Sequence, residues 1–170
     1  MRRSLCVLTS LLVLVNTAAA QFESDSNAPV EITADTMEWM NEKGIAVARG
    51  NADAVQGRYR LRADVLTAYI DQGETAAPNR IRRIDAEGNV VLTTPTESAR
   101  GKVGAYDVER RVAVLEGSVV LVQGNNVLRG EHLTMDLVSG RSTLQGDASG
   151  DIQPAGDGRV KMIFEPESGN

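Results

Sequence analysis

Apolar and polar residues alternate along much of this chain with a period of two. Segment 30–35 alternates Val, Ile and Ala with Glu, Thr and Asp, and short β-branched runs follow at 112–115 and 119–122. This period is typical of β-strands with one buried face. No segment keeps apolar residues at helical spacing through three turns. The pattern therefore predicts an all-β protein with almost no helix.

Turn-forming residues separate the apolar runs. Clusters of Gly, Asn, Ser, Glu and Arg predict turns at 41–44, 109–111, 124–126 and 139–140. Segment 147–158 is rich in Gly, Asp, Ala and Pro, and we predict a loop there. A last alternating strand follows at 159–164 and is closed by Pro166.

The chain repeats itself at an offset of 29 residues. Segment 87–92 (EGNVVL) returns as 116–121 (EGSVVL), Arg-Gly at 100–101 returns at 129–130, and Ala-Asp at 34–35 returns at 63–64. Arg-Gly-Asn at 49–51 matches 87–89 at an offset of 38, and residues 72–80 account for the extra nine. The mature chain is thus predicted to hold about four units of roughly 29 residues.

One unit is predicted to be two long strands, each bent or bulged. Gly50, Gly88, Gly117 and Gly146 lie inside apolar stretches. Glycine in a strand commonly marks a bulge or a sharp bend. The alternative for each of them is a simple turn.

The first twenty residues have the pattern of a secretory signal peptide. Arg2 and Arg3 precede an apolar run at 5–15, and three alanines at 18–20 offer a cleavage site before Gln21. The run is shorter than the roughly 20 residues of a membrane-spanning helix, although an uncleaved anchor is the alternative. We expect a soluble mature chain from Gln21 in a bacterial periplasm. The one cysteine, Cys6, lies in the leader, so the mature chain would have no disulfide and no thiol nucleophile.

Length and charge narrow the possible functions. The chain has 170 residues, which suits one domain, and a formal net charge of −5 that becomes −7 without Arg2 and Arg3. This balance argues against nucleic-acid binding and against electrostatic binding to an anionic membrane surface.

No constellation of catalytic or metal-binding residues is visible. His132 is the one histidine, and in the repeat it occupies the place of Val65 and Val103, which favours a structural role. Asp35 and Asp64 are equivalent by repeat, but Lys102 and Glu131 hold that place in later units. The acidic residues are scattered, so we expect no metal and no cofactor. An enzyme is the least favoured class.

The repeat glycines also predict which strand face is apolar. The second and fourth residues after each glycine are all apolar, whereas the third and fifth form a mixed set. With a period of two, only one set can face inward. We therefore predict an apolar groove lined by Val30, Ile32, Ala52, Ala54, Val90, Leu92, Val119 and Leu121. The alternatives are a closed core, or a bulge that swaps the two faces.

The two terminal strands are candidates for contacts with other chains. A stacked or rolled sheet has edges at both ends, and exposed edges pair with other strands. Such contacts would join unlike edges and build open rods. The predicted contact residues are Val30, Ile32, Val160, Met162 and Phe164.

With these features the chain resembles the LptA-like (OstA-like) family of periplasmic lipopolysaccharide transport proteins. The resemblance covers about residues 29–166. It is carried by the signal peptide, the closing strand and four motifs, namely PVEITAD at 29–35, ARGNA at 48–52, EGNVVL at 87–92 and LEGSVVL at 115–121. No single motif is sharp, but their order and spacing are specific.

The resemblance implies a twisted, open β-jellyroll of many antiparallel strands. It implies head-to-tail stacking into a bridge between the inner and outer membranes, with the acyl chains of lipid A shielded inside. The implied partners are lipopolysaccharide, an inner-membrane LptC-like protein and the N-terminal domain of an outer-membrane LptD-like barrel. The alternative is a β-solenoid that is structural or binds a polysaccharide or protein.

The predicted organisation follows from these features. It comprises a signal peptide (1–20), a flexible lead-in (21–28), the jellyroll repeats (29–146), a Gly/Asp-rich loop (147–158), a terminal edge strand (159–166) and a loose tail (167–170).

Overall fold

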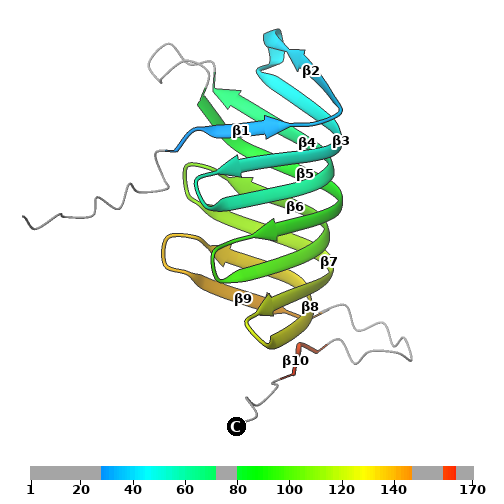
Figure 1. The fold of residues 1–170 in the computed structure, drawn as a ribbon, viewed down its shortest axis with the longest axis vertical. Helices are drawn as coiled ribbons and strands as arrows, with labels where there is room; N and C mark the ends of the chain where they lie inside the picture. The colour runs from blue at the N-terminus through cyan, green and yellow to red at the C-terminus, as the bar shows by residue number, and fades with distance from the viewer. Residues whose placement is uncertain (1–27, 72–79, 147–158, 164–170) are drawn as a thin grey trace, which may run out of the picture.

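The computed structural model describes residues 28–71, 80–146 and 159–163. The predicted signal peptide, residues 21–27 of the lead-in, residues 72–79 of the insertion, the loop at 147–158, Phe164 and the tail at 167–170 lie outside these residues. The described residues form one antiparallel sheet of ten strands (Figure 1). The strands are β1 (Val30–Thr33), β2 (Thr36–Met40), β3 (Ile45–Gln56), β4 (Tyr59–Asp71), β5 (Arg80–Thr93), β6 (Glu97–Asp107), β7 (Val112–Gln123), β8 (Asn126–Asp136), β9 (Arg141–Gln145) and β10 (Lys161–Ile163).

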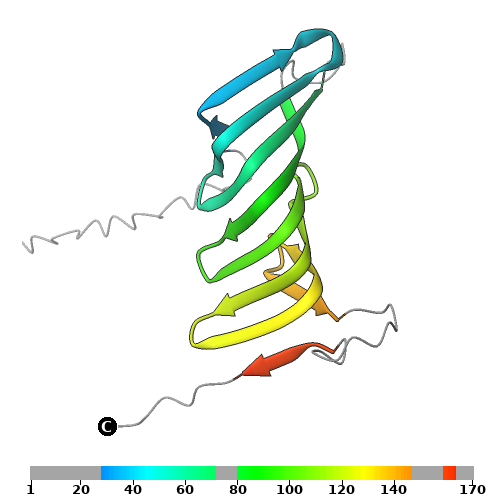
Figure 2. The ribbon, with the colours of Figure 1, turned by 90° about the vertical axis from the view of Figure 1, so that its right-hand side faces the viewer.

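Successive long strands pair as a continuous meander from β3 to β8. Two half-strands complete each end, since β1 and β2 both pair with β3, and β9 and β10 both pair with β8. The strands stack along the long axis of the molecule with a progressive twist (Figure 2). The sheet does not close on itself, which confirms the predicted all-β, open and twisted jellyroll.

A β-bulge at the middle of the long strands folds the sheet into two arms. Gly50-Asn51, Gly88-Asn89 and Gly117-Ser118 each oppose a single residue of the next strand, and all six have positive φ. Glycine adopts this conformation without a Cβ clash. The bulge prediction is thus confirmed at three glycines. It is wrong at Gly146, which lies after β9 and outside any strand.

The bulges define two arms of the sheet. Arm 1 holds β1, β10 and residues 52–56, 59–63, 90–93, 97–101, 119–123 and 126–130. Arm 2 holds β2, β9 and residues 45–49, 65–71, 80–87, 103–107, 112–116 and 132–136. One face of each arm contributes to a single buried cluster, so the arms enclose a common interior.

The repeated Ala-Asp and Gly-Asn pairs meet at the corner between the arms. Asn51 Nδ2 donates to Asp35 Oδ2 at 2.9 Å, and Asn89 Nδ2 donates to Asp64 Oδ2 at 2.8 Å. Each aspartate lies over the glycine of the neighbouring strand, where a side chain would collide with it. These two aspartates, equivalent in the sequence, therefore hold equivalent bulges in place.

Chain reversals follow most of the predicted turns. A 3-10 turn at Asn41–Lys43 ends on Gly44 in the left-handed conformation. Two strand boundaries differ from the prediction. The strand predicted at 30–35 ends at Thr33, since the chain turns the corner through Asp35. The strand predicted at 159–164 is β10, which covers only Lys161–Ile163 among the described residues. Within the described residues, no helix has the length and apolarity to cross a membrane.

Candidate functional site

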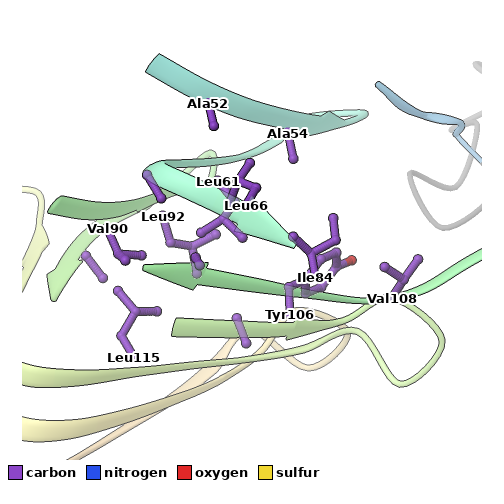
Figure 3. Close-up of a cluster of buried hydrophobic side chains, with 14 of the residues drawn as sticks. Ala52, Ala54, Leu61, Leu66, Ile84, Val90, Leu92, Tyr106, Val108 and Leu115 are labelled. Carbon is purple, nitrogen blue, oxygen red and sulfur yellow. The ribbon is translucent and has the colours of Figure 1, made fainter. Parts of the chain in front are cut away.

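The interior between the arms is a continuous apolar cluster. Figure 3 shows side chains from β3 to β7 pointing into this shared space. Of the predicted groove residues, six are at most 5% exposed, namely Ala52, Ala54, Val90, Leu92, Val119 and Leu121. Val30 and Ile32 are half-buried and pack against the cluster. The third and fifth residues after each glycine face outward, so the bulges do not swap the two faces.

Arm 2 supplies a second wall that the sequence analysis missed. Its fully buried side chains include Leu66, Ile84, Leu115 and Leu133. Ile84 and Leu115 stand at even offsets before the corner glycines Gly88 and Gly117. Leu66 and Leu133 stand two residues after Asp64 and Glu131, the residues opposite two of the bulges. Counting backward from the glycines could have found Ile84 and Leu115, whereas Leu66 and Leu133 lie on strands without a corner glycine and needed the pairing register.

The two walls touch, so the interior is narrow. A Cβ added to Gly104 would lie 3.2 Å from Cγ1 of Val90 on the opposite arm, so even an alanine there would require Val90 to shift. Among the described residues, a small space of about 10 Å³ lies against Leu61, Ile84 and Leu92. That volume suits about one water molecule. In this conformation the described residues pack the interior as a core.

The two arms also meet on the side opposite the corner, along a line of contact that we call the seam, and polar groups join the arms there. Tyr106 donates its hydroxyl proton to Gln56 Oε1 at 2.9 Å, and Gln56 Nε2 donates to the carbonyl oxygen of Ala28 at 3.1 Å. Gln56 is only 6% exposed, so these bonds offset the cost of burying its amide. Burial raises the pKa of Tyr106, which keeps its hydroxyl protonated as a donor.

Farther along the stack, the seam opens into a cleft and is joined by further hydrogen bonds. Tyr59 donates to the carbonyl oxygen of Leu137 at 3.3 Å, and Ser142 donates to Glu97 Oε2 at 2.7 Å. A cleft of about 220 Å³ opens here between the hairpin turns of the two arms. The seam is therefore held by a few hydrogen bonds, whereas the corner is held by continuous strands.

The apolar interior reaches both ends of the stack. Met37 and Trp39 on β2 pair with Ala48 and Ala46, whose side chains are buried, so they share the inner face. They are nevertheless 52% and 53% exposed because no further strand covers them among the described residues. At the other end Met162 pairs with Leu128 and is 44% exposed.

The predicted edge-contact residues are divided between these two ends. Val30 and Ile32 pair with Gln56 and Ala54 of β3, and Met162 pairs with β8. Each of β1 and β10 has one strand partner among the described residues. Val160 is exposed and precedes β10. Contact of these residues with another chain remains a prediction.

His132 lies on the polar outer face of arm 2, beside one carboxylate and one hydroxyl group. His132 Nδ1 lies 3.1 Å from Glu116 Oε1, and its other ring nitrogen lies 3.5 Å from Thr134 Oγ1. His132, Val65 and Val103 each follow the residue opposite a bulge, as the repeat alignment predicted. In the described part of the chain, no three potential ligands group around a metal position.

Comparison with known proteins identifies the family. The family model described as "LptA/(LptD N-terminal domain) LPS transport protein" matches residues 31–141. The chain belongs to this LptA/LptD N-terminal domain family. Its members are lipopolysaccharide transport proteins, and the family is not one of enzymes.

Individual relatives agree with this assignment. A Rhizobium meliloti protein of uncharacterized function is 28% identical over 169 residues, which is 97% of this chain and 86% of that one. The lipopolysaccharide export system protein LptH of Pseudomonas aeruginosa is 24% identical over 156 residues, 91% and 89% of the two chains. The crystal structure of LptH, titled the LptA homologous periplasmic component of the lipopolysaccharide transport device, superposes with a TM-score of 0.70 at 23% identity. It covers 84% of this chain and 99% of LptH, which confirms the fold.

Proposed function

We propose that this LptA-family protein carries lipopolysaccharide across the periplasm by shielding lipid A acyl chains between its two arms. The observation that supports this most directly is one apolar interior, lined by both arms, that ends in exposed Met37 and Trp39 at one end and Met162 at the other. Burying an acyl chain there is worth about 0.8 kcal/mol per methylene, so binding needs no specific polar contact.

Acyl chains can enter only if the arms move apart. The interior cavity of about 10 Å³ is too small for a chain in this conformation. The seam is the place where the arms can part, because it is joined by hydrogen bonds such as Tyr106–Gln56 and Tyr59–Leu137 and not by covalent continuity. Each such bond contributes about 1 kcal/mol net, which buried methylenes can offset.

Photo-crosslinking tests where the lipid lies. A photoreactive residue at Ile32, Val90 or Leu121 should capture lipopolysaccharide, because these side chains face the interior. The matched controls are Val91 and Val120, one residue away on the same strands and facing outward. Capture only at the controls would put the lipid on the outer face, and capture at neither set would refute lipid shielding altogether.

We further propose that copies stack head to tail and bridge the inner and outer membranes. The support is that, among the described residues, the outer edges of β1 at one end and of β10 at the other pair with no further strand, and exposed apolar side chains lie at both ends. Edge pairing would give main-chain hydrogen bonds to a second copy, to an LptC-like inner-membrane protein and to an LptD-like N-terminal domain.

Light scattering tests this assembly. The average mass should rise with concentration, and deletion of residues 159–170 should weaken that rise. A strict monomer at every concentration with the tail intact would contradict stacking. The proposal also places the protein in the periplasm with its leader removed, and intact-mass measurement of a periplasmic extract should show a chain that starts near Gln21.

A further inference from the structure

The outer face of arm 1 carries a row of positive charges. Directly opposed residues of paired strands share a face, so the register aligns outward side chains into rows that cross the sheet. From β4 to β10 one such row reads Arg62, Val91, Arg100, Val120, Arg129 and Lys161. We call these six residues the basic row. All four of its cations are exposed, and both valines are half-buried.

Few acidic groups lie beside this row. At the corner, Asp64 and Glu131 stand two residues from Arg62 and Arg129 on the same strands, and they accept hydrogen bonds from Asn89 Nδ2 and from the N–H of Ser118 at the bulges. The neighbouring outward row continues from β5 as Thr93, Ser98, Val122, Val127 and Ile163, all uncharged. On the outer face of arm 1 the carboxylates are Glu31 and Asp53 on the first two strands, and Asp53 lies 3.3 Å from Arg60 and 3.9 Å from Arg62. Among the described residues, Arg100, Arg129 and Lys161 form no ion pair.

Arm 2 has the opposite character. Its outward side chains on β5 to β8 include five carboxylates, Asp85, Glu87, Asp107, Glu116 and Asp136. Although the net charge of the chain is −5, cations predominate on the outer face of arm 1 from β4 onward and carboxylates on the outer face of arm 2 from β5 to β8. The sequence-based argument against nucleic acids and anionic membrane surfaces rested on net charge alone, which takes no account of this local excess of cations on arm 1.

We propose that the basic row is an external track for the phosphorylated saccharide headgroup of lipopolysaccharide. This inference rests on the function proposed above. A headgroup joined to acyl chains in the apolar interior has to leave through the seam. From the hairpin turn at Gly57-Arg58 to Arg62 the path is about four strand residues, or about 13 Å. Arginine binds phosphate oxygens through paired N–H groups, which suits it to this ligand.

The shape of the row also favours an extended ligand. Its cations stand on alternate strands from β4 to β8, so they repeat about every 10 Å along the stacking axis. They lie on an open sheet face and not in a pocket. A row parallel to the stacking axis would continue from one copy to the next in a head-to-tail assembly, so a headgroup could pass from cation to cation as its acyl chains advance inside.

Charge removal on each arm tests the track with a matched control. The test variant is Arg62→Gln/Arg100→Gln/Arg129→Gln on arm 1, and the control is Arg49→Gln/Arg83→Gln/Arg141→Gln on the outer face of arm 2. Both lose three positive charges. Binding is measured with lipopolysaccharide truncated to lipid A and inner core, and with the same material after removal of its phosphates.

If the basic row binds the headgroup, only the arm 1 variant should lose affinity, and only for the phosphorylated ligand. At about fivefold per arginine, the arm 1 variant should bind the phosphorylated ligand roughly 100-fold more weakly at low salt, and the control should match the parent. High salt should remove most of the difference. The dephosphorylated ligand should bind the parent and the arm 1 variant equally.

Three results would overturn the track. Equal affinities of parent and arm 1 variant for the phosphorylated ligand would refute it while leaving the apolar interior as a binding site. No binding of either ligand by the parent would refute both the track and the proposed function. Equally tight, arm 1-dependent binding of phosphatidylglycerol vesicles without lipopolysaccharide would make the row a contact for anionic membranes instead.

Discussion

The corner glycines allow a sharp test of how the sheet is folded into two arms. Gly88 has φ +75° and lies beneath Asp64, so a Cβ at position 88 would approach Asp64 Cβ to 3.0 Å and would overlap its carboxylate. Gly124, in the β7–β8 turn, has φ +56° and nothing within 4 Å of such a Cβ. Gly88→Ala and Gly124→Ala therefore both place a side chain at positive φ, but only Gly88→Ala also makes that side chain collide with Asp64.

The magnitudes follow from those contacts. A side chain in the left-handed region costs about 1–2 kcal/mol, and both variants pay this. Gly88→Ala also displaces Asp64, which forfeits the Asn89–Asp64 hydrogen bond at about 1 kcal/mol and adds overpacking of about 1–3 kcal/mol. We expect a loss of unfolding free energy of about 3–6 kcal/mol for Gly88→Ala and about 1–2 kcal/mol for Gly124→Ala.

Urea unfolding measures the difference. A gap of about 2–4 kcal/mol should separate the two midpoints by roughly 1–2 M at the usual slope for a small domain. The double variant Asp64→Ala/Gly88→Ala should lose at least about 1 kcal/mol less than the sum of its parts, since the carboxylate is gone. Equal losses at Gly88 and Gly124, or additive effects of Asp64→Ala and Gly88→Ala, would refute this account of the corner.

Two further predictions concern single polar groups. Tyr106→Phe leaves Gln56 Oε1 buried without its donor and should lower the unfolding free energy by about 1–3 kcal/mol. The control Tyr69→Phe, on the outer face, should change the unfolding free energy by less than about 0.5 kcal/mol. Equal effects of the two variants in thermal melts would contradict the Tyr106–Gln56 hydrogen bond. The N–H groups of Ser139 and Val138 lower the pKa of Asp136, so this carboxylate contributes stability above its unfolded pKa of about 3.9, and the contribution disappears as pH falls through the lower folded value. Asp136→Asn should flatten the acid limb of a stability–pH curve, and parallel curves for variant and parent would show that Asp136 makes no such contribution.

Local pattern was sufficient for the strand content, the repeat and the inward face of arm 1. Period-two alternation, glycines at fixed spacing and the uniform apolarity of positions such as Val90 and Leu92 are properties of neighbouring residues, and burial follows them directly. The bulges at Gly50, Gly88 and Gly117 were predictable for the same reason, because only a residue that tolerates positive φ fits there. Gly146 has the same repeat position without a strand around it, so the rule failed at the end of the array.

Only the tertiary structure decided which distant residues contact one another and which side chains share a surface. The second wall, with Leu66 and Leu133, becomes one interior with arm 1 only when the corner folds the sheet. The Tyr106–Gln56 bond joins residues 50 positions apart, and no local pattern encodes that distance. The basic row is likewise invisible in sequence order, because its cations lie on different strands and are aligned only by the pairing register. Net charge is a sum over the chain, whereas a charged surface depends on which side chains the fold brings together.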